Sequence, residues 1–97
     1  MARARRVDGN QSEIVCALRT AGASVQILSS VGKGCPDLLV AYRDRWHVLE
    51  IKDGAKVPSK QALTDDEERW HDEFGQQAPV HICNSIESAL AVIGAIN

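Results

Sequence analysis

Two carboxylates and a lysine lie at the ends of two apolar segments that a short turn separates. Asp37 precedes the apolar run of residues 38–42, and Glu50 and Lys52 close the alternating segment of residues 46–52. Proteins bind Mg²⁺ through carboxylate oxygens, and a bound divalent metal polarises a phosphate and activates water. The pattern therefore indicates metal-dependent hydrolysis of a phosphodiester. Lys52 is placed to hold or help deprotonate the attacking water, or to neutralise charge on the phosphate.

The length of the turn decides whether the two carboxylates meet. Side chains alternate between the faces of a strand, so a shift of one residue moves Asp37 and Glu50 to opposite faces. A two-residue loop at residues 43–44, or a four-residue loop at 42–45, pairs them directly with Cβ atoms about 5 Å apart, whereas a three-residue loop separates them unless a bulge intervenes. Carboxylates that close repel, which favours a cation between them. Taken singly, the residues also fit a Pro-Asp turn and a surface Glu–Lys pair at a strand end.

The rest of the chain predicts the elements that position this hairpin. Apolar runs indicate four strands, and apolar residues at helical spacing indicate three helices. The predicted order is helix, three strands, helix, strand, helix, in a single domain of residues 1–97 whose residues 1–9 form a flexible basic arm. The fold class is therefore α/β. The predicted strands are residues 25–28, 38–42, 46–52 and 79–83.

Capping signals mark where the predicted helices begin. Asn10 with Glu13, and Thr64 with Glu67, have the spacing of a capping box, in which the two side chains bond reciprocally to each other's main chain. Ser85 is the predicted cap of the last helix. These signals place helices directly before the first strand, after the hairpin and at the end of the fold.

Charge is distributed unevenly along the chain, although the formal net charge is only −2. The second predicted helix gathers acidic residues between positions 65 and 73, around an expected buried stripe of Trp70 and Phe74. A basic face and an acidic far side fit a phosphate backbone docking on one side, and they fit solvated charge on both faces about as well. The candidate DNA-binding cations are Arg3, Arg5, Arg6, Lys33, Lys56 and Lys60.

Several other classes of protein are not expected. No apolar run has membrane-spanning length and the N-terminus lacks the apolar stretch of a signal peptide, so we expect a cytoplasmic protein with reduced thiols and no membrane partner. The three cysteines lack Cys-x-x-Cys spacing, and His47, His71 and His81 form no pair with ligand spacing, so no zinc site is expected. No elbow motif supports a serine or cysteine nucleophile.

The motif Gly-Cys-Pro-Asp at residues 34–37, followed by Glu-Ile-Lys at residues 50–52, resembles the signature of the PD-(D/E)XK nucleases. More narrowly, the chain is similar to virus-type replication-repair nuclease (VRR-Nuc) domains, especially the short stand-alone phage proteins. The supporting pieces are Glu13 on the first helix and the segments GCPDLLV, WHVLEIKDG and SKQALTDDEERWHDEF. The likeness covers about residues 10–93, nearly the whole chain.

This resemblance implies a restriction-endonuclease-like αβββαβ core with a mixed central sheet flanked by helices. It implies that Asp37, Glu50 and the main-chain carbonyl of Ile51 hold Mg²⁺ or Mn²⁺, and that Lys52 assists catalysis. It also implies that Glu13 faces the site.

Two acidic residues have competing interpretations. Glu13 fits the capping box with Asn10 about as well as a catalytic role. Many relatives carry Gln at the position of Glu67, for which the capping box with Thr64 is the stronger interpretation. Each of these two acids therefore has two possible roles.

The expected activity is that of a Mg²⁺- or Mn²⁺-dependent DNA endonuclease in a bacterial or phage-infected cell. Similarity to the stand-alone phage proteins further implies a homodimer acting on branched DNA such as Holliday junctions, and a 97-residue protomer is too small to embrace a junction alone. The candidate dimer surfaces are the hairpin tip (residues 42–46), the last strand and the Ala/Ile-rich last helix. The alternative is a non-catalytic DNA-binding module or a subunit of a larger repair complex. The intact acids and lysine argue against it, because a pure binder has no reason to cluster acids near phosphate.

Overall fold

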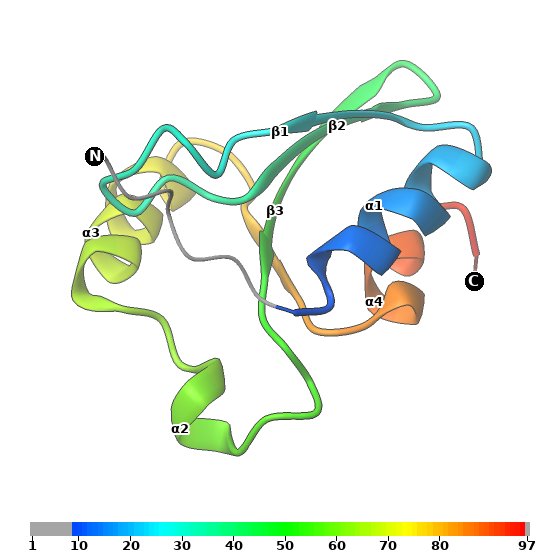
Figure 1. Ribbon diagram of the computed structural model, residues 1–97. Coiled ribbons are helices and arrows are strands. Elements are labelled where there is room, and N and C mark those ends of the chain that lie inside the picture. The colour runs from blue at the N-terminus through cyan, green and yellow to red at the C-terminus, as the bar shows by residue number, and fades with distance from the viewer. Residues whose placement is uncertain (1–8, 97) are drawn as a thin grey trace.

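The computed structural model describes residues 9–96, which form a mixed α/β fold (Figure 1). The sheet order is β1-β2-β3-β4, with antiparallel pairing throughout except for the parallel β3–β4 pair. The α/β class and the mixed sheet flanked by helices are therefore confirmed. Arg3, Arg5 and Arg6, predicted to bind DNA, lie outside the described residues. The elements are α1 (Gln11–Thr20), β1 (Ser24–Ile27), β2 (Leu38–Tyr42), β3 (Arg45–Ile51), α2 (Pro58–Gln61), α3 (Asp65–Gly75), β4 (His81–Cys83) and α4 (Ile86–Val92).

Two differences from the predicted elements concern the second half of the chain. The short helix α2 lies within the segment that was expected to be a loop, where Pro58 occupies its first turn. Strand β4 begins at His81 rather than at Pro79, in keeping with the inability of proline to donate to a strand ladder. None of the described helices is long and apolar enough to cross a membrane.

A two-residue turn sets the register of the β2–β3 hairpin. Tyr42 pairs with Arg45, which leaves Arg43 and Asp44 as the loop, with positive φ angles of 48° and 68°. Positive φ at both central positions is typical of a type I′ turn, whose twist matches that of the flanking strands. Of the loop lengths that the sequence left open, the hairpin has the two-residue one, and it places Asp37 and Glu50 opposite each other at the far end of the hairpin.

The hydrophobic core lies on one face of the sheet. Inward side chains of β2 and β3 pack there against α1 and α4, which lie together on that side of the sheet in Figure 1. Alternation along the strands sends the side chains of Asp37 and Glu50 to the opposite face. The buried apolar residues that form the core are Ile14, Val15, Leu18, Ala23, Leu38, Val40, Leu49, Ile51, Cys83, Ala89 and Ile93.

The predicted capping box at the start of α1 is wrong. Asn10 has helical backbone angles and its side chain makes no capping hydrogen bond. Its side-chain amide instead donates to the carbonyl oxygens of Lys52 at 3.1 Å and Asn84 at 3.4 Å. Tertiary partners therefore replace the local one, and Asn10 ties the start of α1 to the chain just beyond β3 and β4. Glu13 is exposed rather than held in a box.

Helix α3 covers part of the other face of the sheet, and its inward side is polar. The predicted capping box is confirmed, because Thr64 Oγ1 accepts from the Glu67 N–H and Glu67 Oε1 accepts from the Thr64 N–H. The predicted buried stripe is wrong: Trp70 is half-buried, Phe74 is 45% exposed, and their rings stack on each other with centroids 4.0 Å apart. Glu67 is the buried residue of the helix.

Gly34 allows the loop before β2 to approach the first turn of α3. Its φ is +82°, and a Cβ atom there would lie 2.1 Å from the carbonyl oxygen of Asp66. That separation is far below a van der Waals contact. A side chain at position 34 would therefore push α3, and with it Glu67, away from the sheet.

We expect Gly34→Ala to lower the free energy of unfolding by more than about 2 kcal/mol, since it adds a clash to the cost of a left-handed alanine. Gly32→Ala is the matched control, because Gly32 has a φ of +79° and a Cβ added there would meet no atom within 4 Å. That control should lose only about 1 kcal/mol. Urea unfolding of the two variants checks this. Equal losses would show that the contact with α3 does not constrain position 34.

Candidate active site

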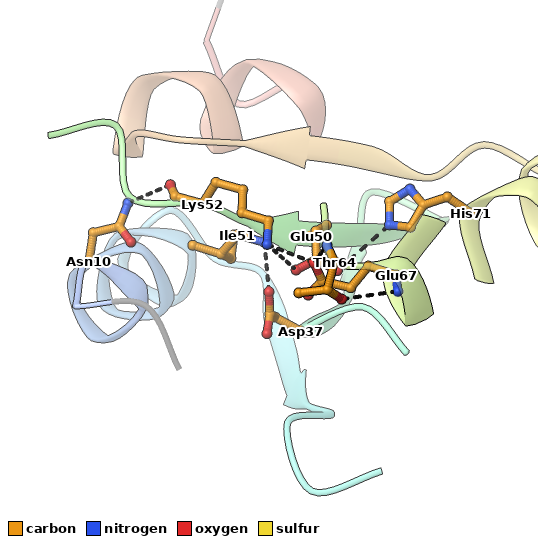
Figure 2. Close-up of polar contacts among 8 residues, drawn as sticks. All are labelled: Asn10, Asp37, Glu50, Ile51, Lys52, Thr64, Glu67 and His71. Atoms are coloured by element: carbon orange, nitrogen blue, oxygen red, sulfur yellow. Dashed lines mark hydrogen bonds and ion pairs between the residues drawn. The ribbon is translucent and has the colours of Figure 1, made fainter. Parts of the chain in front are cut away.

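Asp37 and Glu50 meet on the sheet face opposite the core (Figure 2). Both are buried, with 4% and 1% of their surface exposed. One oxygen of Asp37, Oδ2, accepts a hydrogen bond of 2.7 Å from the main-chain N–H of Ile51. The Asp37 carboxylate is thus fixed to the main chain of β3, directly beside Glu50, as the hairpin register predicts.

The surroundings of Glu50 disfavour its charged form. Burial raises its pKa to about 10, aided by the hydrogen bond that protonated Glu50 donates to Asp37, by the charge of Asp37 and by the charge of Glu67, while Lys52 acts in the opposite direction. A buried carboxyl group with a second carboxyl group beside it holds a proton at neutral pH unless a cation takes the proton's place. This is the electrostatic condition expected of a metal-binding pair before the metal is bound.

Lys52 lies at the same end of β3 and is held by α3. Its Nζ is 2.7 Å from Glu67 Oε1 and 4.0 Å from Glu50 Oε2, with both partners and Lys52 itself buried. Burial alone would raise the pKa of Glu67, but the hydrogen bonds from Lys52 and from the Thr64 N–H lower it. The Lys52–Glu67 pair is therefore charged, and Glu67 both caps α3 and orients the lysine.

His71 is a neighbour of Glu50 that the sequence analysis did not include in the site. Its Nε2 lies 3.6 Å from Glu50 Oε1. Burial lowers the pKa of His71, and of the nearby charges Glu67 raises it while Lys52 lowers it further. Glu67 and His71 are four residues apart and so lie on one face of α3. That spacing was readable in the sequence, but it gave no indication of which face of the helix would meet the sheet.

Other predicted site residues lie elsewhere. Glu13 is exposed and lines a hollow with Asp53, Asn84 and Glu87, which none of Asp37, Glu50 and Lys52 lines. The structure thus does not bring Glu13 to the carboxylate pair. Because Asn10 is turned toward Lys52, the first turn of α1 still contacts the chain at the site, through a residue expected only as a cap.

The candidate DNA-binding lysines lie in two segments of the chain, the loop before β2 and the segment that follows β3. Lys33 is exposed and lines a hollow with Asp66, Arg69, Trp70 and Glu73 of α3. Lys56 is exposed in the segment that follows the site, where its carbonyl accepts a hydrogen bond from the Gln61 side chain. The main chain of Lys60 belongs to α2, and its side chain lies outside the described part of the structure.

The carboxylate pair fits a hard divalent cation. Asp37 and Glu50 are buried side by side, and carboxylate oxygens are among the ligands that Mg²⁺ and Mn²⁺ prefer. Within residues 9–96, no group of three or more His, Cys, Asp or Glu side chains is arranged to hold a metal. A cation here would therefore use Asp37 and Glu50 with main-chain, water or phosphate oxygens, and the Ile51 carbonyl stays a predicted ligand.

Comparison of the chain with models of protein families, with curated proteins and with solved structures gives no match. We therefore infer the function from the geometry and charges of the site.

We predict that Glu50→Gln stabilises the metal-free protein. The pKa of Glu50 is about 10 in the folded state against an ordinary value of 4.5, so its contribution to stability is complete below pH 4.5 and is lost as the pH rises toward 10. At pH 8 the variant should gain about 1–3 kcal/mol in unfolding free energy, and the decline in stability from pH 5 to 9 should flatten. Chemical denaturation in a chelator measures both.

Magnesium provides the complementary measurement. At a Mg²⁺ concentration one hundred times the Kd for Mg²⁺, the unfolding free energy of the wild type should rise by about 2–3 kcal/mol. The same concentration should not stabilise Glu50→Gln. Glu87→Gln, an exposed change on α4, should behave like the wild type in both measurements. A Glu50→Gln variant less stable than the wild type at pH 8 in chelator would contradict this account of the carboxylate pair.

Proposed function

We propose that this protein is a Mg²⁺- or Mn²⁺-dependent DNA endonuclease. The observation that supports this most strongly is the buried set of Asp37, Glu50 and Lys52 on one sheet face, in which two carboxylates lie side by side and a lysine stands 4.0 Å from one of them. Burying two carboxyl groups side by side is unfavourable, and a structural role alone gives no reason for it. Cleavage of a phosphodiester uses such a set, because it needs a cation for the phosphate and a second positive group for the developing charge.

Each residue has a distinct task in this proposal. A bound Mg²⁺ or Mn²⁺ supplies Lewis-acid activation of the phosphate, and Asp37, Glu50 and the Ile51 carbonyl are the groups that would hold it. Asp37 is oriented for this by the Ile51 N–H. Lys52 lies beside the carboxylate pair, where its ammonium group stabilises negative charge that develops on the phosphate.

The ion pair with Glu67 narrows the role of Lys52. A contact of 2.7 Å with a carboxylate favours the protonated amine, which has no lone pair to accept a proton from water. We therefore assign Lys52 to charge stabilisation rather than to general-base catalysis. Glu67 holds the ammonium group near Glu50 through the transition state.

The substrate we propose is branched DNA such as a four-way junction, cut by a homodimer. Trp46 is 72% exposed and Ile82 is 53% exposed, and both belong to the sheet face that carries Glu50. A second protomer seated on this face would cover both side chains and remove their apolar surface from water. A two-fold dimer formed through the hairpin tip and β4 would present two sites for paired cuts in opposing strands. The contacts to DNA are assigned to Lys33, Lys56 and Lys60 and to the N-terminal arginines.

The second candidate is a non-catalytic DNA-binding module or a subunit of a larger repair complex. The exposed Trp46 and Ile82 would suit attachment to another protein as well as to a second copy. Cleavage of a labelled four-way junction with Mg²⁺ or Mn²⁺, against none in chelator, distinguishes the two. Binding without cleavage in any divalent metal would favour the module.

Asp37→Asn should abolish metal-dependent junction cleavage while the protein stays folded, because it removes a charge from the proposed metal site.

Lys52→Met should reduce single-turnover cleavage by about 10²–10³-fold with little change in DNA affinity. Since that change leaves Glu67 buried without its partner, Lys52→Met/Glu67→Gln serves as a charge-matched second variant. Lys56→Ala should instead weaken DNA binding, and it should reduce the slope of log binding constant against log salt concentration by about one. Normal cleavage by Asp37→Asn would refute the nuclease proposal.

Trp46→Glu should weaken dimerisation by about 2 kcal/mol or more, thus about thirty-fold in Kd, if this side chain lies at the centre of the interface. Native mass spectrometry across micromolar concentrations measures the dimer. Val31→Glu is the matched control, since Val31 is 62% exposed in a loop away from the hairpin tip. A wild type that stays monomeric and still cuts junctions symmetrically would show that no dimer is needed.

A further inference from the structure

Two buried polar atoms face each other at the site without a hydrogen bond. Glu50 Oε1 and His71 Nε2 are 3.6 Å apart, and neither has a hydrogen-bond partner among the described residues. Figure 2 shows the His71 ring pointing from α3 toward the Glu50 carboxylate. Buried polar atoms are almost always paired in folded proteins, so two unpaired atoms facing each other indicate a contact that forms in another state of the site.

The contact needs only a small movement to become a hydrogen bond. An N–H···O bond has a usual length of about 2.9 Å, so a shift of about 0.7 Å closes the gap. A neutral imidazole with its proton on Nε2 is a donor at that atom. The other oxygen of Glu50, Oε2, faces Lys52 at 4.0 Å. The two oxygens of Glu50 therefore have different surroundings, one on the His71 side and one on the Lys52 side.

We propose that His71 is a positioning residue for the metal-binding form of Glu50. Its Nε2–H donates to Oε1 and fixes the carboxylate so that Oε2 is presented with Asp37 to the cation. This inference rests on the proposed function, since it assumes that Glu50 holds a divalent metal. Groups that hydrogen-bond to metal-binding side chains in this way commonly change metal affinity by about 10–100-fold when removed.

The arrangement gives each carboxylate of the pair one fixed oxygen. Asp37 Oδ2 is held by the Ile51 N–H at 2.7 Å, and Glu50 Oε1 faces His71 Nε2 at 3.6 Å. Helix α3 then supports the site at two points one turn apart, because Glu67 holds Lys52 and His71 holds Glu50. A rigid pair of carboxylates loses less freedom when it binds a cation, which favours binding.

The experiment is a Mn²⁺ titration of the full chain followed by the electron paramagnetic resonance signal of free Mn²⁺ at one neutral pH, without DNA. His71→Leu should weaken Mn²⁺ binding by about tenfold or more. His71→Gln should bind within about threefold of the wild type, because the glutamine amide nitrogen reaches the place of Nε2 and also donates. Glu73→Gln, an exposed change on the same helix, should leave the affinity unchanged. Circular dichroism establishes that the variants are folded.

The outcomes separate this inference from the proposed function. A wild type that does not bind Mn²⁺, or a Glu50→Gln variant that binds it equally well, would refute the metal site itself. Wild-type binding with equal affinity in a folded His71→Leu variant would refute only the role of His71. Loss of affinity in both His71→Leu and His71→Gln, with a ¹⁴N coupling to Mn²⁺ in the wild-type pulsed spectrum, would make His71 a direct ligand and overturn the positioning role. Rescue by glutamine without that coupling supports it.

Discussion

Two buried carboxylates that face each other across a hairpin impose the main constraint on this structure. Asp37 and Glu50 are almost fully covered, and burial with mutual repulsion raises the pKa of Glu50 to about 10. The surrounding contacts all act on this pair. The Ile51 N–H bonds to Asp37, and Lys52 stands beside Glu50. At the end of the hairpin that carries this pair, the sheet face opposite the core is thus organised by charge rather than by apolar packing.

Helix α3 joins that face through polar groups. Its buried residue is Glu67, whereas Trp70 and Phe74 stack on each other at the surface. The close approach of Gly34 to the first turn of the helix fixes the distance at which Glu67 can reach Lys52. Because polar contacts hold α3 against the site, the strength of its docking depends on the charges in the site. The residues proposed for catalysis are therefore also the ones that hold α3 in place.

Features of the fold that depend on residues close together in the chain could be predicted from the sequence. From the sequence, a turn of two or four residues pairs Asp37 with Glu50, and the structure has the two-residue turn. The Thr64 capping box was predictable because it depends only on neighbouring residues. Predictions failed where a tertiary partner competed with the local one. Asn10 bonds to Lys52 and Asn84 instead of capping α1. The contacts of Glu67 and His71 with the end of β3 depend on how α3 docks on the sheet, and no local pattern records that docking.

The hairpin also bears on the order in which the chain folds. In the sequence, Asp37 and Glu50 are separated only by the hairpin, whereas α2 and α3 lie between β3 and its parallel partner β4. Local pairings of this kind cost less chain entropy and tend to form earlier than distant ones. The two acids would then be forced together before α3 delivers Glu67 to anchor Lys52. Burial is the largest cause of the raised pKa of Glu50, and this burial is completed only when α3 docks. Most of the electrostatic cost of the site therefore arises late in folding and acts more on the rate at which the chain unfolds than on the rate at which it folds.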